Sequence, residues 1–243
     1  MQASGRPGLA VQAPGGRAPV LRARAVILDL DGTLLDTAAD LAAAVNAMLA
    51  DAGRAPLPVE RVAAYVGKGA AVLVHRALTG DPEGRAPEAE FEPAYRSFLD
   101  HYRVENGRSA VLYPGVLAGL EAMRAKGLRL AVVTNKPQSF VGPLLEQCGI
   151  AHFFELAVGG DSLARRKPDP LPMLHVCESF GLEPAQVVAI GDSANDALAA
   201  RAAGMPVLAV PYGYNEGRDV RSLDVDAIVS SLLEAAGLIE ACA

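Results

Sequence analysis

A chain of 243 residues, 51% hydrophobic but only 5% aromatic, is long enough for one large domain or for a core with a smaller companion. No apolar run approaches the roughly 20 residues of a membrane-spanning helix, and the separated cysteines form neither a zinc motif nor a disulfide framework, which favours a reducing cytoplasmic location. The net charge is −6, and residues 25–243, with 18 basic and 28 acidic residues, carry −10, which disfavours nonspecific attraction to nucleic acid. Neither nucleic acid nor a membrane is expected as a partner.

The first 24 residues differ in composition from the rest of the chain. They are rich in Gly, Pro, Ala and Arg, and they show neither the apolar core of a signal peptide nor helical periodicity. We predict a disordered tail over residues 1–24. A targeting or docking role is the alternative.

The first buried strand, predicted over residues 25–30, runs into two carboxylates. Asp29 and Asp31 lie two positions apart, and Gly32 and Thr33 follow at once. Residues i and i+2 of a strand point to the same side, although the turn at Gly32 begins to redirect Asp31. Two close carboxylates repel unless a cation or a proton separates them, so the pair is a candidate for metal binding and divided catalytic roles. The alternative is a strand that merely ends in a turn, which Asp and Gly favour.

Helical signals follow without any strand signal between them. Helices are predicted over 38–52, after Pro58, over 70–78 and over 87–103. We therefore predict an all-helical insert over residues 38–107. The core domain would consist of residues 25–37 and 108–243.

From Tyr113 onward, predicted helices and strands alternate. Strands are predicted over 128–133, 155–158, 187–190, 206–210 and 227–229. Repeated units of this kind predict an α/β fold, a Rossmann-like, doubly wound parallel sheet. The ligand of such a sheet binds at the carboxyl ends of the strands.

Further polar groups follow these predicted strand ends. Thr134 and Asn135 end one strand, Asp192 and Ser193 end another, and Lys167 lies between them in the chain. Each has an ordinary structural explanation in isolation, as a cap, a solvated cation or a helix-terminal acid. Their joint occurrence at one sheet edge indicates phosphoryl chemistry. The hydroxyl, the amide and the ammonium are predicted to bind the phosphate, where charge is redistributed in the transition state.

The carboxylates can divide the remaining work. A carboxylate can attack phosphorus and form an aspartyl-phosphate, and Asp29 is the predicted nucleophile. Mg²⁺ prefers oxygen ligands, and Asp192 supplies a distant carboxylate for it, with Asp196 one helical turn further on. Asp31 can protonate the leaving alkoxide and then deprotonate the attacking water.

These motifs resemble those of the haloacid dehalogenase superfamily. They stand here as residues 29–33, 134–135, 167–168 and 191–196, and the match covers nearly everything after residue 24. The resemblance implies that Asp29 is nucleophile and metal ligand, that Asp31 is acid/base and offers its backbone carbonyl to Mg²⁺, and that Asp192 completes the protein ligands. It also implies that the helical insert is a mobile cap.

Within the superfamily the chain is most similar to bacterial phosphoglycolate phosphatases, over residues 66–70, 113–116, 167–170 and 212–215. The resemblance implies Mg²⁺-dependent hydrolysis of 2-phosphoglycolate, a small phosphorylated metabolite, by a monomer or homodimer. The glycine loop of the cap often carries Asn where this chain has Lys68. Lys68 is therefore a candidate for substrate specificity through a substrate carboxylate, or else a solvent-exposed lysine.

Other activities on the same fold remain open. They are a phosphatase for another small ester, a phosphosugar mutase, and a phosphonate hydrolase that would use Lys68 as a Schiff base. Asp31 argues against a dehalogenase, which needs no acid for a leaving alkoxide. A silent binding protein is disfavoured because every catalytic position is filled.

Overall fold

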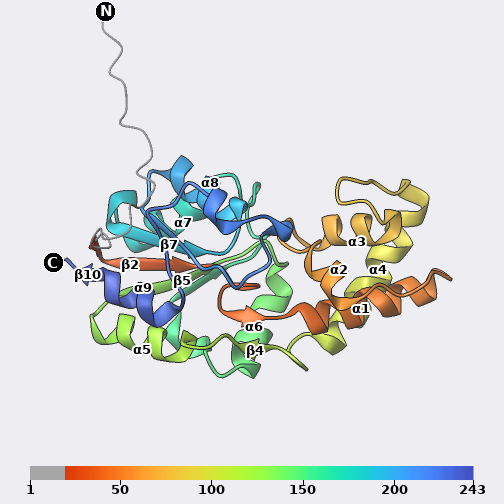
Figure 1. Ribbon diagram of the computed structural model, residues 1–243, viewed down its shortest axis with the longest axis horizontal. Coiled ribbons are helices and arrows are strands. Elements are labelled where there is room, and N and C mark those ends of the chain that lie inside the picture. Colours follow the sequence, from red (N-terminus) through yellow and green to blue (C-terminus); the bar gives the residue numbers. More distant parts are fainter. Residues whose placement is uncertain (1–19, 243) are drawn as a thin grey trace, which may run out of the picture.

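A six-stranded parallel sheet forms the centre of the core in the computed structural model, which describes residues 20–242 (Figure 1). Its strands in spatial order are β6 (Leu156–Val158), β5 (Arg129–Val133), β2 (Ala25–Leu28), β7 (Val187–Gly191), β8 (Val207–Ala209) and β9 (Ala227–Ile228). The chain proceeds outward from β2 to β5 and β6, then crosses to β7 on the other side of β2. The predicted doubly wound sheet is confirmed, and the reversal beside β2 marks its ligand-binding edge.

Side-chain alternation along the strands explains why both faces of the sheet are covered. Val26 and Leu28 pack into one hydrophobic layer, whereas Ala25 and Ile27 pack into the other. The first layer contains α5 (Val116–Ala125), α6 (Gln138–Gln147) and α9 (Leu232–Leu238), and the second contains α7 (Leu171–Phe180) and α8 (Ala194–Ala203). Figure 1 shows these groups on opposite sides of the sheet. Short 3₁₀ turns occupy Ala151–Phe153, Pro184–Gln186, Asn215–Gly217 and Val220–Ser222.

The helical insert forms a separate lobe beyond the end of the sheet (Figure 1). Its helices are α1 (Ala38–Asp51), α2 (Val59–Ala63), α3 (Ala70–Thr79) and α4 (Glu88–Glu105). They share a hydrophobic cluster of their own, to which the core contributes Phe140. We refer to residues 38–107 as the cap.

A two-stranded stem that the sequence did not reveal joins the cap to the core. β3 (Leu35–Asp36) pairs antiparallel with β4 (Val111–Leu112). The buried carboxylate of Asp40 accepts hydrogen bonds from the backbone N–H groups of Gly107 and Ser109, each at 2.7 Å. The outgoing and returning segments are therefore tied together at the base of the cap.

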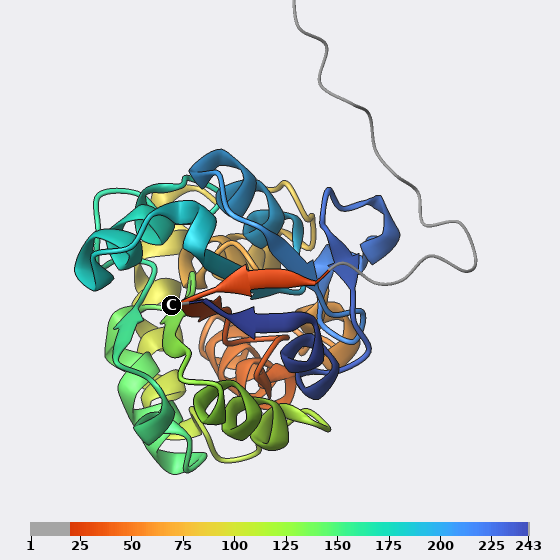
Figure 2. The same ribbon diagram turned by 90° about the vertical axis from the view of Figure 1, so that its left-hand side faces the viewer.

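The predicted tail over residues 1–24 is wrong at its last positions. β1 (Leu21–Ala23) pairs in parallel with β10 (Ile239–Ala241), and the two strands lie side by side in Figure 2. Ala23 is fully buried, and the N–H of Arg24 donates to the carbonyl of Gln186 at 2.8 Å. Residues 21–23 form a strand because they pair with β10, which lies more than 200 residues away in the chain. No local pattern in the sequence reveals this pairing. Residues 1–19 lie outside the described part of the chain.

Within residues 20–242, no helix is both long and apolar enough to cross a membrane.

Candidate active site

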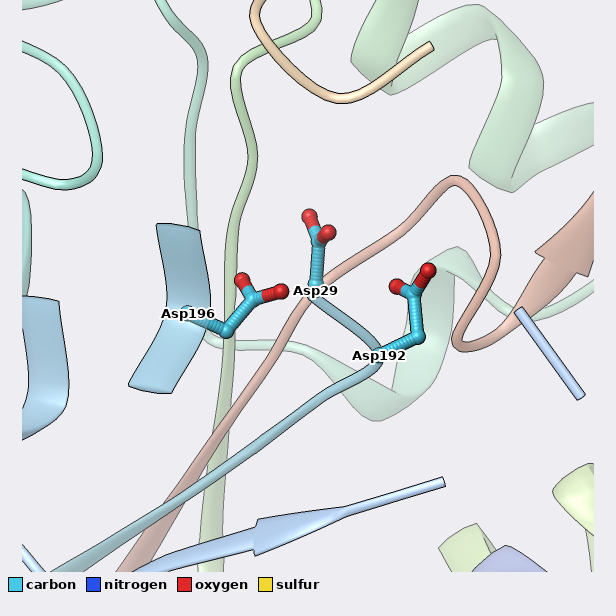
Figure 3. A group of neighbouring side chains, drawn as sticks. All are labelled: Asp29, Asp192 and Asp196. Atoms are coloured by element: carbon cyan, nitrogen blue, oxygen red, sulfur yellow. The ribbon is translucent and has the colours of Figure 1, made fainter. Parts of the chain in front are cut away.

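Three carboxylates meet at the carboxyl ends of β2 and β7. Asp29 follows β2, Asp192 follows β7, and Asp196 lies in the first turn of α8. One oxygen from each lies within 4.8 Å of the others, and Figure 3 shows the three side chains around a common space. The N–H of Asp29 donates to the carbonyl of Ile190 at 3.0 Å, so the strand pairing continues up to the site.

Lys167 bridges two of these carboxylates. Its Nζ lies 2.8 Å from Oδ1 of Asp29 and 2.6 Å from Oδ1 of Asp196, and it also donates to the carbonyl of Val133 at 2.6 Å. The side chain is only 2% exposed. Burial alone would lower the pKa of Lys167, but Asp196 and Asp29 outweigh burial and raise it. The lysine therefore stays charged within the site.

The pKa values of two carboxylates in the site are also raised, which favours their uncharged form. Burial raises the pKa of Asp29 to about 8; Lys167 opposes this shift, whereas Asp196 and Asp192 add to it. Burial and Asp196 raise the pKa of Asp192 to about 7. When all three carboxylates are ionised, one ammonium leaves an excess of two negative charges in the described site. A divalent cation matches that excess, and carboxylate oxygens suit Mg²⁺.

The partners of the carboxylates distinguish their roles. Asp196 pairs with Lys167 through Oδ1, while its Oδ2 accepts from the N–H and Oγ of Ser193 at 3.1 and 2.6 Å. Asp192 accepts only from neutral donors, Oγ1 of Thr33 at 2.9 Å and the N–H of Tyr214 at 2.8 Å, and forms no ion pair within residues 20–242. Asp29 and Asp192 are thus the residues that fit a metal, and Asp196 orients Lys167.

Asp31 lies apart from this cluster. Its Oδ1 accepts from Oγ1 of Thr37 at 2.7 Å and lies 3.1 Å from Nζ of Lys136. Asp31 therefore has partners other than those of Asp29 and is not part of the carboxylate cluster. Lys136, which the sequence reasoning missed, also donates to the hydroxyl of Tyr102 in the cap. Its position directly after Thr134 and Asn135, at the same strand end, was the available signal.

Thr134 and Asn135 have different positions at the end of β5. Both line the cavity beside Asp29, and Oγ1 of Thr134 accepts from the N–H of Lys136 at 3.2 Å. Nδ2 of Asn135 donates to the carbonyls of Gly67 at 2.9 Å and Lys167 at 3.0 Å. The Asn135 amide thus ties the cap loop to the loop that carries Lys167.

Position 32 requires a glycine because of its backbone conformation and because of the side chain of Asp192 beside it. Its φ is +89°, and a Cβ there would lie 2.5 Å from Oδ2 of Asp192. Larger residues are disfavoured at positive φ, and here they would also displace Asp192. Thr33 and Ser193 support the site through the hydrogen bonds already described.

A small cavity, partly open to solvent, lies between the core and the cap. The core side carries the polar groups, among them Asp29, Asp31, Thr134 and Lys136. The cap side is mainly apolar and includes Leu41, Val66, Leu73, Phe98 and Tyr102. The site therefore suits a small, strongly polar substrate held at the sheet edge.

Lys68 is not brought to the catalytic groups. Its Nζ lies 3.4 Å from Oε1 of Glu216 and 3.7 Å from Oε1 of Glu83. The neighbouring glycines Gly67 and Gly69 line the cavity, but Lys68 does not. This placement supports neither a substrate contact nor a Schiff base at Lys68.

The chain is similar to known proteins over most of its length. A sequence model of haloacid dehalogenase-like hydrolases matches residues 23–204. The phosphoglycolate phosphatase of Nitrosospira multiformis is 52% identical over 217 residues, which cover 89% of this chain and 96% of that protein. The phosphoglycolate phosphatase of Thiobacillus denitrificans is 49% identical over 216 residues, 89% of this chain and 95% of the relative. A predicted phosphoglycolate phosphatase from Haemophilus somnus, known from a crystal structure, is 37% identical in sequence. The two structures match with a TM-score of 0.84, and the match covers 89% of this chain and 97% of the other.

Proposed function

Because the chain belongs to the haloacid dehalogenase-like hydrolases, we propose that it is a phosphatase that hydrolyses 2-phosphoglycolate to glycolate and phosphate. The main structural support for phosphatase chemistry is that Asp29, Lys167 and Asp192 lie close together at one edge of the sheet. The substrate assignment is supported by relatives of that name, which are about half identical over nearly their whole length.

In the first step, Oδ of Asp29 attacks phosphorus and the ester P–O bond breaks. Asp31 gives its proton to the departing alkoxide, which leaves as glycolate. Lys167 and Thr134 stabilise the negative charge on the nonbridging oxygens. Asp29, Asp192 and the backbone carbonyl of Asp31 would hold Mg²⁺, whose charge screens the phosphate from the attacking carboxylate.

In the second step, Asp31 takes a proton from a water molecule that attacks the phosphorus of the aspartyl-phosphate. The bond between phosphorus and Asp29 breaks, and phosphate is released. Asp31 is thereby protonated again for the next cycle. The apolar cap residues Leu41, Leu73 and Phe98 limit access of bulk water during these steps.

A panel of small phosphate monoesters tests the proposal. We expect 2-phosphoglycolate to have the highest kcat/KM of the panel, and chelation of Mg²⁺ to abolish turnover. Asp29→Asn removes the nucleophile and should lower kcat by roughly 10³-fold or more without changing the circular dichroism spectrum. A different ester at the top of the panel would overturn the substrate assignment, and full activity of Asp29→Asn would overturn the mechanism.

A further inference from the structure

The proposed substrate carries two anionic groups, and the site as described accounts for one of them. Lys167 and Thr134 serve the phosphate. The carboxylate of 2-phosphoglycolate also needs a partner, because a charge transferred from water into a closed site is costly without one. The remaining cations near the cavity are therefore the candidates.

Two cations of the cap are already committed elsewhere. Arg76 is 2% exposed and donates through Nη2 to Oε1 of Glu216 at 2.6 Å. Lys68 lies at 3.4 Å from the same glutamate oxygen. Among the described cap residues that line the cavity, none carries a positive charge, and Tyr102 is the one with a polar side chain.

Lys136 differs from both. Among the described residues that line the cavity, it alone carries a positive charge. Its side chain is 2% exposed, and its Nζ contacts Oδ1 of Asp31 at 3.1 Å and the hydroxyl of Tyr102. The ammonium thus lies where the core and the cap meet, beside the proposed acid.

The chemistry of the ester then connects Lys136 to the carboxylate. The leaving oxygen must lie next to Asp31, which protonates it, and the carboxylate carbon is only two bonds from that oxygen. If the chain hydrolyses 2-phosphoglycolate, as proposed above, we infer that Lys136 is the specificity-determining residue that binds the substrate carboxylate. Tyr102 is the second donor, because its hydroxyl oxygen accepts from Lys136 and its hydrogen is left to donate.

The test compares two substrates that share the ester oxygen. Ethyl phosphate replaces the carboxylate of 2-phosphoglycolate by a methyl group. The readout is the ratio of kcat/KM for 2-phosphoglycolate to that for ethyl phosphate, in which any effect of a mutation on Asp31 common to both substrates cancels. Lys136→Met should lower this ratio by about 10- to 100-fold, the range of a hydrogen bond to a charged group.

Lys68→Met is the rival variant, because Lys68 lies between Gly67 and Gly69, which line the cavity. We expect it to change the ratio by less than threefold. Lys136→Gln keeps a donor for Asp31 and Tyr102 and serves if methionine prevents folding, and it should also lower the ratio at least about 10-fold. Tyr102→Phe should lower the ratio by a smaller factor, about 3- to 10-fold.

The outcomes separate the two proposals. A wild-type protein that does not prefer 2-phosphoglycolate over ethyl phosphate would contradict the proposed function, and this inference with it. A wild-type preference that survives both Lys136→Met and Lys136→Gln would contradict this inference alone. Loss of the preference in Lys68→Met, but not in Lys136→Met, would assign the carboxylate to Lys68 instead.

Discussion

Single hydrogen bonds determine how the carboxylates of the site are oriented. Thr33 and the N–H of Tyr214 each hold one oxygen of Asp192, so this side chain is fixed although it has no ion-pair partner in the described part of the chain. Groups that orient a metal ligand commonly affect affinity for the metal by 10- to 100-fold. Thr33 is therefore expected to act on Mg²⁺ binding without touching the substrate.

Thr33→Val removes the hydroxyl that donates to Asp192 and keeps a similar shape. We expect the Kd for Mg²⁺, measured by activity titration and by thermal shift, to rise about 10-fold. Thr79→Val is the matched control, because Oγ1 of Thr79 donates to the carbonyl of His75 on an exposed part of the cap. An unchanged Mg²⁺ affinity in Thr33→Val would show that this hydrogen bond does not orient Asp192.

At the residue scale, the sequence predicted the strand-end groups better than their partners. Asp29 and Asp192 follow strands, and Lys167 lies in a loop between strands. Because ligands of parallel sheets bind at the carboxyl ends of the strands, these residues were expected to lie together. Lys136 and Tyr214 act through contacts with residues far away in the chain, such as Asp31 and Asp192. No local pattern contains those contacts.

Between elements, the segment 212–217 connects the core with the cap. The Tyr214 hydroxyl accepts from the N–H of Thr37 and donates to Oδ1 of Asp36, both at 2.8 Å, at the start of the cap. Two residues later, Glu216 pairs with the buried Arg76 of α3. The segment that holds Asp192 thus also contacts both the entrance and the body of the cap.

Glu216→Ala would leave Arg76 buried without its main counter-charge. We expect the free energy of unfolding in urea to fall by about 3 kcal/mol. Glu90→Ala is the matched control, because Glu90 pairs with Arg54 at 2.5 Å but the two side chains are 49% and 41% exposed. The control should lose at most about 1 kcal/mol. Equal losses in the two variants would show that burial of Arg76 does not strengthen its pair.

At the element scale, the cap helices and the strands of the main sheet could be predicted, whereas the four strands of the two small sheets could not. The cap helices and the six strands of the main sheet have runs of apolar residues with clear boundaries. β3 and β4 are two residues long, and β1 with β10 joins distant parts of the chain. Each of these strands pairs with a segment far away in the chain, so no local pattern reveals the pairing.

Over the whole molecule, the buried carboxylates should make stability depend on pH. The pKa of Asp29 is raised from its ordinary 3.8 to about 8, and that of Asp192 to about 7. The native state without metal therefore holds protons that the unfolded chain has already lost between about pH 4 and pH 8. The contribution of these two carboxylates to stability therefore falls as pH rises through this range.

In the presence of EDTA, we expect a lower Tm at pH 8 than at pH 6. Saturating Mg²⁺ should raise Tm more at pH 8, because the ion binds the ionised carboxylates of the native state. Asp192→Asn should reduce both the pH dependence and the gain from Mg²⁺, which separates this effect from titration elsewhere. A gain from Mg²⁺ that is the same at both pH values would contradict the assignment.

The antiparallel pairing of Asp36 with Val111 has an evolutionary consequence. The whole cap is inserted into what is otherwise a hairpin, so its length and sequence can change without shifting the register of the central sheet. Replacing residues 37–110 by a short turn would restore that hairpin and leave every proposed catalytic carboxylate in the core. Selection can thus alter which esters are admitted while the machinery that cleaves them is inherited intact.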